Sequence, residues 1–300
     1  MDRELQHNAV LDRIPGWAGR QRIEQPLSGG VTNRNYRVQL GAEVFVVRIP
    51  AKSADWLGID RRLEYQASLL AAACGVGPEV VAFLEPEGVL VTRFIQGLPV
   101  SDADVHLPGT LTRVAESLLA IHHAGILPAA FSSFRVVERY AATAREHGLP
   151  IPAALERSLA IAASIEQAIP LAAPLLCHND LLNANFIDDG DRIRVVDWEY
   201  AAMGDPYFDL GNFAVNHGLA DEEQRFLLEA YAGEAAEPAL ARLHLMRLMS
   251  DFREAMWGVV QQGASELDFD FRSYAARHFE RLLAAAADPR FRGWLAQASA

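Results

Sequence analysis

Lysine and cysteine are the two residue types that this 300-residue sequence most clearly lacks. All but one of its 27 basic residues are arginine, so Lys52 is the single candidate for any mechanism that needs a lysine amine. Two cysteines, Cys74 and Cys177, can supply neither a disulfide framework nor the ligand spacing of a zinc site. A reducing, cytoplasmic location is therefore expected.

Long apolar runs are absent as well, since no stretch approaches ~18 consecutive apolar residues. The first ten residues, MDRELQHNAV, are polar and acidic where a secretory signal would carry basic residues and then an apolar segment. The sequence thus predicts neither membrane insertion nor a targeting segment.

Positive charge is in deficit, because the formal net charge is −12 and the sequence pI is about 5.2. Nucleic-acid binders need clustered Lys and Arg to displace counterions, so no nucleic-acid partner is expected. A cationic small molecule is electrostatically easier to accommodate, although solubility alone also explains an acidic surface.

The first third of the chain shows strand-like patterns separated by Gly-bearing turns. One helix interrupts them over about 60–73, where Leu63, Ala67 and Leu70 recur at helical spacing before Gly75. The strand-like segments cover 23–26, 36–40, 44–49 and 89–95.

Beyond Gly97 the apolar periodicity becomes helical. One β element breaks this pattern: two β-prone segments, 186–187 and 193–196, flank the turn-rich tetrapeptide DDGD at 188–191, which predicts a hairpin. The expected helices cover 111–123, 134–146, 153–167, 221–232, 238–261 and 271–286.

With 51% hydrophobic residues, the chain can bury a large core in one big domain or in two lobes that share a cleft. The pattern predicts an α+β, bilobal fold. A small antiparallel-sheet lobe of five strands and one main helix would span 1–95, and a larger, mostly helical lobe would span 96–300. The boundary would fall near 94–97.

The densest polar cluster, HNDLLNAN at 178–185, lies directly before the hairpin, and Asp197 directly follows it. Phosphoryl transfer from ATP needs a carboxylate that accepts or orients the hydroxyl proton, and oxygen ligands for magnesium. Asp180 suits the first role. Because Asn185 enters the first strand and Asp197 leaves the second, antiparallel pairing brings both side chains to the same open end.

How specific this pattern is depends on the hairpin. H-x-D-x-x-x-x-N fixes three residue types, and chance gives such a match on the order of one per cent in a chain of this length. An aspartate at the hairpin exit makes coincidence much rarer, against the alternative that these polar residues only cap loops. His178 is more simply explained as a neutral histidine that packs beneath the loop.

A second candidate element is Ser28-Gly29-Gly30, which lies between two predicted strands. Glycine lacks the Cβ that would keep anionic oxygens from backbone amides, so this segment predicts a phosphate loop. Thr32 and Asn33 are possible further donors. A plain turn is the alternative.

Linked motifs extend this pattern in a fixed order along the chain: LSGGVTNRNY (27–36), VVRIP (46–50), IDRRLE (59–64), LCHNDLLNANF (176–186), VVDWEYA (195–201), GDPYFDLGNF (204–213), WGVVQQ (257–262) and FRSYAARHF (271–279). Together they resemble the choline and ethanolamine kinases within the aminoglycoside phosphotransferase-like group, whose fold is similar to that of protein kinases. The resemblance covers roughly nine-tenths of the chain, and motifs in linked order are far more specific than any one alone.

The resemblance implies site roles. Asp180 would be the catalytic base, and Asn185 and Asp197 would be the magnesium ligands. Glu199 would add a carboxylate near the metal or the substrate. Asp209 would be a buried carboxylate that accepts backbone N–H bonds from the catalytic loop and so fixes it; the alternative is a helix N-cap ahead of Leu210.

For ATP binding, kinase-like folds usually carry a lysine on the third strand that pairs with a helix glutamate. Choline kinase relatives use arginine there, and this chain has Arg48, while Lys52 lies beyond the strand. We expect Arg48 to pair with Glu64, against the alternative of two unrelated surface charges. Phe94 and Ile95 complete the predicted nucleotide site.

The acceptor is expected to be a small hydroxylated molecule, because DWE replaces the DFG motif of protein kinases and no A-P-E segment follows. Choline would need aromatic faces around its ammonium group, each worth ~0.5–2 kcal/mol, and carboxylates nearby. The candidates are Tyr200 and Trp257 as aromatics, with Glu199, Asp251 and Glu254 as acids. A core tryptophan is the alternative for Trp257.

Several substrates stay open. Eukaryotic choline kinases carry a second tryptophan after W-G-x where this sequence has Val260, which makes the predicted cage poorer. An amino alcohol such as choline or ethanolamine is the first hypothesis. Thiamine or an aminoglycoside is the second, since DWEYA also resembles thiamine kinases. An inactive nucleotide-binding module is the third, and the intact Asp180, Asn185 and Asp197 speak against it.

Overall fold

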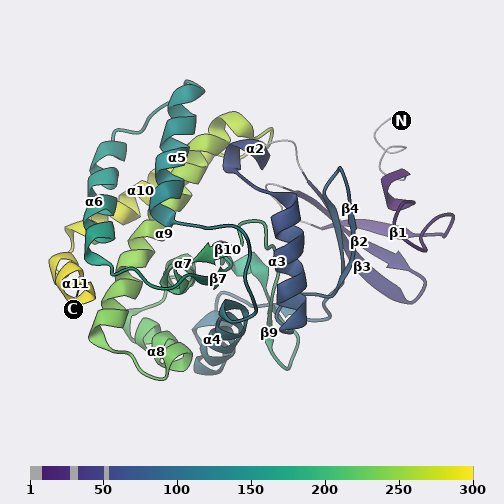
Figure 1. Ribbon diagram of the computed structural model, residues 1–300, viewed down its shortest axis with the longest axis horizontal. Coiled ribbons are helices and arrows are strands. Elements are labelled where there is room, and N and C mark those ends of the chain that lie inside the picture. The colour runs from purple at the N-terminus through teal and green to yellow at the C-terminus, as the bar shows by residue number, and fades with distance from the viewer. Residues whose placement is uncertain (1–8, 28–32, 51–53, 300) are drawn as a thin grey trace.

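The N-terminal part of the chain forms a five-stranded antiparallel sheet in the order β1-β2-β3-β5-β4 (Figure 1). The computed structural model describes residues 9–27, 33–50 and 54–299. Gly41, with a φ of 67°, allows the tight turn between β2 and β3. The strands of this sheet are β1 (Ile23–Leu27), β2 (Asn33–Leu40), β3 (Glu43–Pro50), β4 (Val80–Leu84) and β5 (Val89–Arg93).

Alternation along β2 and β3 gives this sheet its own apolar core. Val38 and Leu40 on β2 and Phe45 and Val47 on β3 are buried, and they pack with Leu11, Ile14 and Trp17 from the segment before β1. In β3 this alternation leaves Val44, Val46 and Arg48 on the opposite face of the strand. Arg48 therefore points away from the apolar core.

Helix α3 (Arg61–Ala73) lies between the sheet and the helical part of the molecule (Figure 1). It begins at Asp60, whose carboxylate accepts hydrogen bonds from the backbone nitrogens of Arg62 at 2.8 Å and Leu63 at 3.3 Å. Ala67 and Ala71 pack into the apolar core of the C-terminal part. Small residues on this face bring α3 close to that core.

The C-terminal part is helical and is organised around α9, which is buried on all sides over most of its length. Helices α5, α7, α10 and α11 pack against it. Gly211 of α7 permits close approach, because a Cβ there would lie 2.7 Å from the backbone nitrogen of Arg247. Besides α3, the helices are α2 (Ala54–Leu57), α4 (Pro108–His122), α5 (Ser133–Glu146), α6 (Leu155–Ala168), α7 (Pro206–Asn216), α8 (Asp221–Ala232), α9 (Glu237–Ala264), α10 (Phe271–Ala287) and α11 (Phe291–Ala298).

Two small sheets position the polar cluster. β8 (Phe186–Asp188) and β9 (Ile193–Val195) form the predicted antiparallel hairpin, and β6 (Leu98–Pro99) pairs with β8. β7 (Leu175–Cys177) pairs with β10 (Ala202–Gly204). The cluster at 178–185 therefore connects two short sheets, with a 3₁₀ turn at Asn183–Asn185 just before β8.

The predicted α+β class is confirmed, with an antiparallel sheet first and helices after it. The division into 1–95 and 96–300 stays a prediction. The sequence pattern did not locate β4, β7, β10 or α11, because elements of three to eight residues carry too few positions to show a period. In the described ranges, no helix combines the length and apolarity needed to cross a membrane.

Candidate active site

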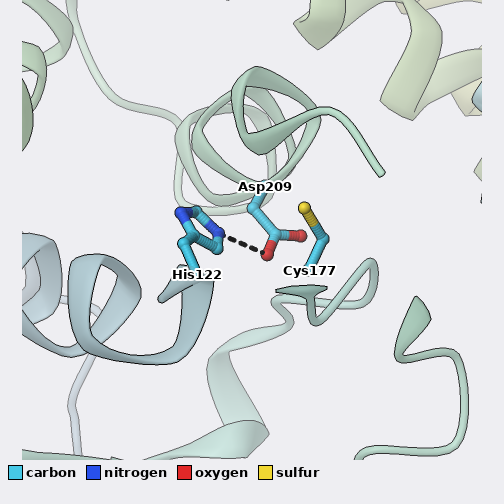
Figure 2. A group of neighbouring side chains, drawn as sticks. All are labelled: His122, Cys177 and Asp209. Carbon is cyan, nitrogen blue, oxygen red and sulfur yellow. Dashed lines mark hydrogen bonds and ion pairs between the residues drawn. The ribbon is translucent and has the colours of Figure 1, made fainter. Parts of the chain in front are cut away.

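Asp209, on α7, holds the backbone of the loop that follows β7. Its Oδ2 accepts a hydrogen bond from the backbone nitrogen of His178 at 2.7 Å, and its Oδ1 accepts one from that of Asn179 at 2.7 Å. The imidazole of His122 lies 3.1 Å from Oδ2 (Figure 2). Asn179 has a φ of 66°, which residues other than glycine rarely adopt. These bonds fix the turn that presents Asp180.

The alternative interpretation of Asp209 as a helix cap is wrong. Asp205 caps α7 by accepting a hydrogen bond from the backbone nitrogen of Tyr207 at 3.0 Å, and Asp209 lies fully buried one turn further on. His122, Cys177 and Asp209 are close enough together to hold a metal ion (Figure 2). However, both Asp209 oxygens already accept hydrogen bonds, and burial raises the pKa of the Cys177 thiol. This group supports the loop.

His178 packs beneath the loop, where the sequence predicted a neutral histidine. Its Nε2 donates to the backbone oxygen of Val196 at 3.0 Å, and its Nδ1 accepts from the backbone nitrogen of Asp180 at 3.2 Å. The ring also makes an edge contact with Trp198. Burial lowers the pKa of His178, so the ring is neutral. It ties the loop to the segment after β9.

Asp180, the predicted catalytic base, contacts Arg253 on α9, a residue that the sequence pattern did not single out. Nη1 of Arg253 lies 2.9 Å from Oδ1 of Asp180 and also pairs with Glu254. The guanidinium carbon lies 4.4 Å from the ring centre of Tyr200. Burial raises the pKa of Asp180, Arg253 opposes this, and Glu254 and Asp197 raise the pKa further. The catalytic loop thus depends on a charge that comes from a distant helix.

A signal for Arg253 does exist in the sequence. α9 is buried on every side from Leu240 to Gln261, so a charged residue inside that segment must find an internal partner. Asp251, Arg253 and Glu254 interrupt the apolar pattern together. Such a group in an otherwise apolar helix indicates buried ion pairs, although it does not name the partner on another element.

Asn185 and Asp197 meet at the open end of the hairpin, as the sequence predicted. The Asn185 amide donates to the backbone oxygen of Asp180 at 2.8 Å, and its backbone oxygen accepts from Val196 at 3.0 Å. Asp197 follows with a φ of 72°. Within the described ranges, no hydrogen bond reaches the Asn185 amide oxygen or the second Asp197 carboxylate oxygen. These are the hard oxygen donors that magnesium prefers, so the pair fits such an ion.

Arg48 forms the predicted ion pair with Glu64, since Nη1 lies 2.8 Å from Oε1. The same nitrogen also pairs with Asp197, so Arg48 connects β3, α3 and the end of the hairpin. Burial disfavours the charged guanidinium, but Asp197 and Glu64 outweigh it and raise the pKa of Arg48. The arginine is therefore a fixed positive charge between two carboxylates.

Glu199, predicted as a further metal or substrate ligand, contacts the N-terminal part. Its Oε2 accepts from the Asn33 amide at 2.8 Å and pairs with Arg61 at 3.0 Å. Arg61 also pairs with Glu64 at 2.7 Å. Burial raises the pKa of Glu199, and nearby Asp197 adds to this effect. Glu199 thus joins the sheet to the segment after β9, and its metal and substrate roles stay predictions.

Much of the predicted nucleotide site falls outside the described residues. This applies to the predicted phosphate-loop residues Ser28, Gly29, Gly30 and Thr32; Lys52, which was not assigned to the site, also lies outside. Phe94 and Ile95 follow β5 and are partly exposed, and the backbone nitrogen of Phe94 donates to Val44 at 3.0 Å. Their nucleotide role stays a prediction.

The two aromatics predicted for a cation cage already contact one another. The indole nitrogen of Trp257 donates to the Tyr200 hydroxyl at 3.1 Å. Phe271 and Tyr274 pack edge-on against Trp257, which is only 9% exposed. Val260 is fully buried in the helical core. The expectation that the cage is poorer without a second tryptophan at this position stays a prediction.

The two predicted acids on α9, Glu254 and Asp251, have different partners. Glu254 accepts a hydrogen bond from the Tyr274 hydroxyl at 2.7 Å and stays beside Arg253. Asp251 instead pairs with His278 at 2.8 Å and with Arg281 on α10. Asp251 therefore binds α10, whereas Glu254 belongs to the surroundings of Asp180.

A pocket of about 90 Å³ is lined by two of the predicted substrate residues, Glu199 and Tyr200, and by Tyr140, Phe131 and Leu57, among others. A larger hollow of about 530 Å³ lies between α3 and the turn from β4 to β5, and none of the predicted site residues lines it. Of these two hollows, the smaller one is therefore the one that predicted substrate residues line.

Comparisons with known proteins show which family this fold belongs to. The model of the phosphotransferase enzyme family matches residues 24–246. A crystal structure of a choline/ethanolamine kinase family protein from Mesorhizobium loti is 32% identical, with a TM-score of 0.85 over 99% of both chains. Ethanolamine kinase 2 of Mus musculus is 29% identical over 91% of this chain and 78% of its own length.

The choline kinase LicA from Streptococcus pneumoniae is 22% identical, with a TM-score of 0.79 over 96% of this chain and 99% of that one, and shares the fold. The family model spans well over half of the chain, and the Mesorhizobium protein matches over nearly its whole length. The chain therefore belongs to the phosphotransferase enzyme family and, within it, to the choline/ethanolamine kinase family of small-molecule kinases.

Proposed function

We propose that this kinase transfers the terminal phosphoryl group of ATP to the hydroxyl of a small amino alcohol of the choline or ethanolamine type. The observation that carries the proposal is the meeting of Asp180, Asn185 and Asp197 at one end of the β8–β9 hairpin, where Asn185 binds the Asp180 backbone at 2.8 Å. Phosphoryl transfer needs one proton acceptor and two oxygen donors for magnesium in such proximity.

In this reaction the alcohol oxygen forms a bond to the terminal phosphorus while the bond from that phosphorus to the bridging oxygen of ADP breaks. The hydroxyl proton passes to Asp180. One carboxylate oxygen of Asp180 is bound by Arg253, and the side chain keeps 12% of its exposure, which leaves the second oxygen for the alcohol. Asn185 and Asp197 would hold magnesium, which supplies positive charge beside the phosphates when bound.

The nucleotide side relies on Arg48. Its guanidinium lies between Glu64 and Asp197, so a phosphate placed near Asp197 would also meet a fixed positive charge. Arginine keeps that charge at any physiological pH. Arg48 thus takes the place of the lysine that the described part of the sheet does not supply.

A coupled ADP-release assay with magnesium and ATP tests the proposal, using ethanolamine and choline as acceptors and mass spectrometry to detect the phosphate ester. We expect saturable turnover with at least one of them, lost in Asp180→Asn. Asp191→Asn is the matched control, because Asp191 is exposed in the turn of the same hairpin. If only thiamine or an aminoglycoside is phosphorylated, that compound replaces the amino alcohol as the proposed acceptor. If no alcohol is phosphorylated, the kinase activity is rejected.

A further inference from the structure

The guanidinium of Arg253 makes the kinds of contact that a substrate cation would need. It lies over the Tyr200 ring at 4.4 Å and pairs with Asp180 at 2.9 Å and with Glu254. An aromatic face with two carboxylates is what a quaternary ammonium group needs. Here the protein's own cation fills that arrangement.

The other candidate partners for a substrate cation are also engaged. Phe271 and Tyr274 pack against Trp257, and its indole nitrogen donates a hydrogen bond to the Tyr200 hydroxyl. Asp251 pairs with α10, and Glu199 accepts bonds from the N-terminal part of the chain. A trimethylammonium group that entered would have to displace one of these contacts.

Arg253 itself is not easily displaced. Its side chain is 1% exposed, and Nε and Nη2 are buried with no hydrogen-bond partner within the described ranges, so its stability depends on the two carboxylates and the ring. Moving it would leave Asp180 and Glu254 as two buried like charges without a counterion. The bound guanidinium is therefore a fixed part of the acceptor site.

Two carboxylates and one guanidinium leave one negative charge in this group when both carboxylates are ionised. A primary ammonium group can use it, because its N–H donors bond directly to carboxylate oxygens, and an oxygen that already pairs with Arg253 can accept a second hydrogen bond. A quaternary ammonium group has no N–H donor and gains mainly from aromatic faces, and Arg253 covers one face of Tyr200.

We propose that Arg253 is a specificity-determining residue that makes the site favour a primary-ammonium alcohol and reject a trimethylammonium alcohol. The inference rests on the proposed function, since it selects among amino alcohols for that same reaction. It names the acceptor class by the chemistry of its amine: small, singly charged and able to donate hydrogen bonds.

The wild-type enzyme tests this without any substitution. Ethanolamine and its N-methyl, N,N-dimethyl and N,N,N-trimethyl (choline) derivatives are compared by kcat/KM for ester formation. We expect kcat/KM to fall with each added methyl group, until the value for choline is at least about tenfold below that for ethanolamine. The fall should come mainly from a higher KM, because the cation–π contact with one aromatic face is lost. Equal or better turnover of choline would overturn the inference while leaving the kinase activity intact. No turnover across the series would reject both.

Two variants then assign the effect to Arg253. Arg253→Met keeps the length of the side chain but frees the Tyr200 face, so the ratio of choline to ethanolamine kcat/KM should rise at least about tenfold, even if both values fall. Arg253→Lys retains the charge and should retain the wild-type ratio. Because a ratio cancels any general loss of activity, an unchanged ratio in Arg253→Met contradicts the proposal.

Discussion

Two buried arginines flank the candidate catalytic centre, and they are built alike. Arg48, from the sheet, pairs with Glu64 and with Asp197. Arg253, from α9, pairs with Glu254 and with Asp180. Each therefore joins a carboxylate of the centre to a carboxylate on a helix. In the proposed reaction, Arg48 lies on the nucleotide side and Arg253 on the acceptor side.

Their surroundings differ in a way that matches different tasks. Arg48 keeps 12% of its side-chain exposure, and Arg61 shares its partner Glu64. The side chain of Arg253 keeps only 1% of its exposure and lies against the aromatic ring of Tyr200. A charge that must meet phosphates needs an open side, whereas a charge that only shapes a pocket can be enclosed. The first arginine is suited to bind a ligand, and the second to exclude one.

The largest expected effect comes from the carboxylate that Arg253 holds. Asp180→Asn should lower kcat by about 10²–10⁴-fold, because the hydroxyl proton loses its acceptor. The amide still offers an oxygen to Arg253, so the free energy of unfolding should change by less than about 1 kcal/mol. Stopped-time ester assays and urea unfolding measure the two quantities.

A parallel loss of activity and stability in Asp180→Asn would contradict this assignment, because Asp180 would then be a structural partner of Arg253. Asp189→Asn is unsuitable as a control, since its carboxylate caps the hairpin turn. Asp191→Asn, in the same turn, is exposed and should change neither quantity.

On the nucleotide side, Arg48→Met should lower kcat/KM for ATP by at least about 30-fold, the equivalent of about 2 kcal/mol for removing one partner of a buried charge pair. The KM for the alcohol should change little, because Arg253 is untouched. Arg93→Met is the matched control, since it removes, from the neighbouring strand β5, an exposed pair with Glu43 of β3. Equal changes in both KM values would mean that the two arginines do not divide the site as proposed.

Arg48 and Arg253 also show how much of the site can be predicted from the sequence. Strand alternation placed Arg48 on one face of its strand, and the family resemblance supplied its pairing with Glu64. The hairpin, with Asn185 entering it and Asp197 leaving it, was predictable from a tight turn between two β-prone segments. These features follow from local patterns or from the resemblance.

Arg253 could not be predicted from such patterns. Its contact with Asp180 joins residues 73 positions apart, and only the packing of α9 against the loop brings them together. The contact between Asp209 and the loop was expected from the family resemblance, but the role of Asp205 as the true cap appeared only in three dimensions. Periodicity tells which face is buried, and tertiary packing decides what that face meets.

The support of the loop can be separated from its chemistry. Asp209→Ala leaves the backbone nitrogens of His178 and Asn179 buried without acceptors, so the free energy of unfolding should fall by at least about 2 kcal/mol. Asp205→Ala, at the start of the same helix, removes its cap and a partly exposed pair with Arg242 at 2.7 Å, and should cost about 1 kcal/mol. Urea denaturation compares them. If Asp209→Ala is no worse than Asp205→Ala, the loop is held by something else.

The smallest expected effect tests whether Arg253 alone sets the position of Glu254. Tyr274 donates to the second oxygen of Glu254 at 2.7 Å, a bond that has no counterpart around Glu64, whose second oxygen meets Arg61 instead. Tyr274→Phe should lower the free energy of unfolding by about 1 kcal/mol. The ratio of choline to ethanolamine kcat/KM should stay within about threefold of wild type, equivalent to less than 1 kcal/mol.

Tyr231→Phe is the matched control for this last change, because it removes a hydroxyl bond of 2.7 Å to His122, behind the catalytic loop. Both variants should lose similar stability, measured by urea unfolding, and neither should alter acceptor preference. A large shift in acceptor preference in Tyr274→Phe alone would show that the guanidinium and the hydroxyl hold Glu254 together. In that case the acceptor side would depend on a cluster of Arg253, Glu254 and Tyr274, and it would resemble the Arg48 side only in its ion pairs.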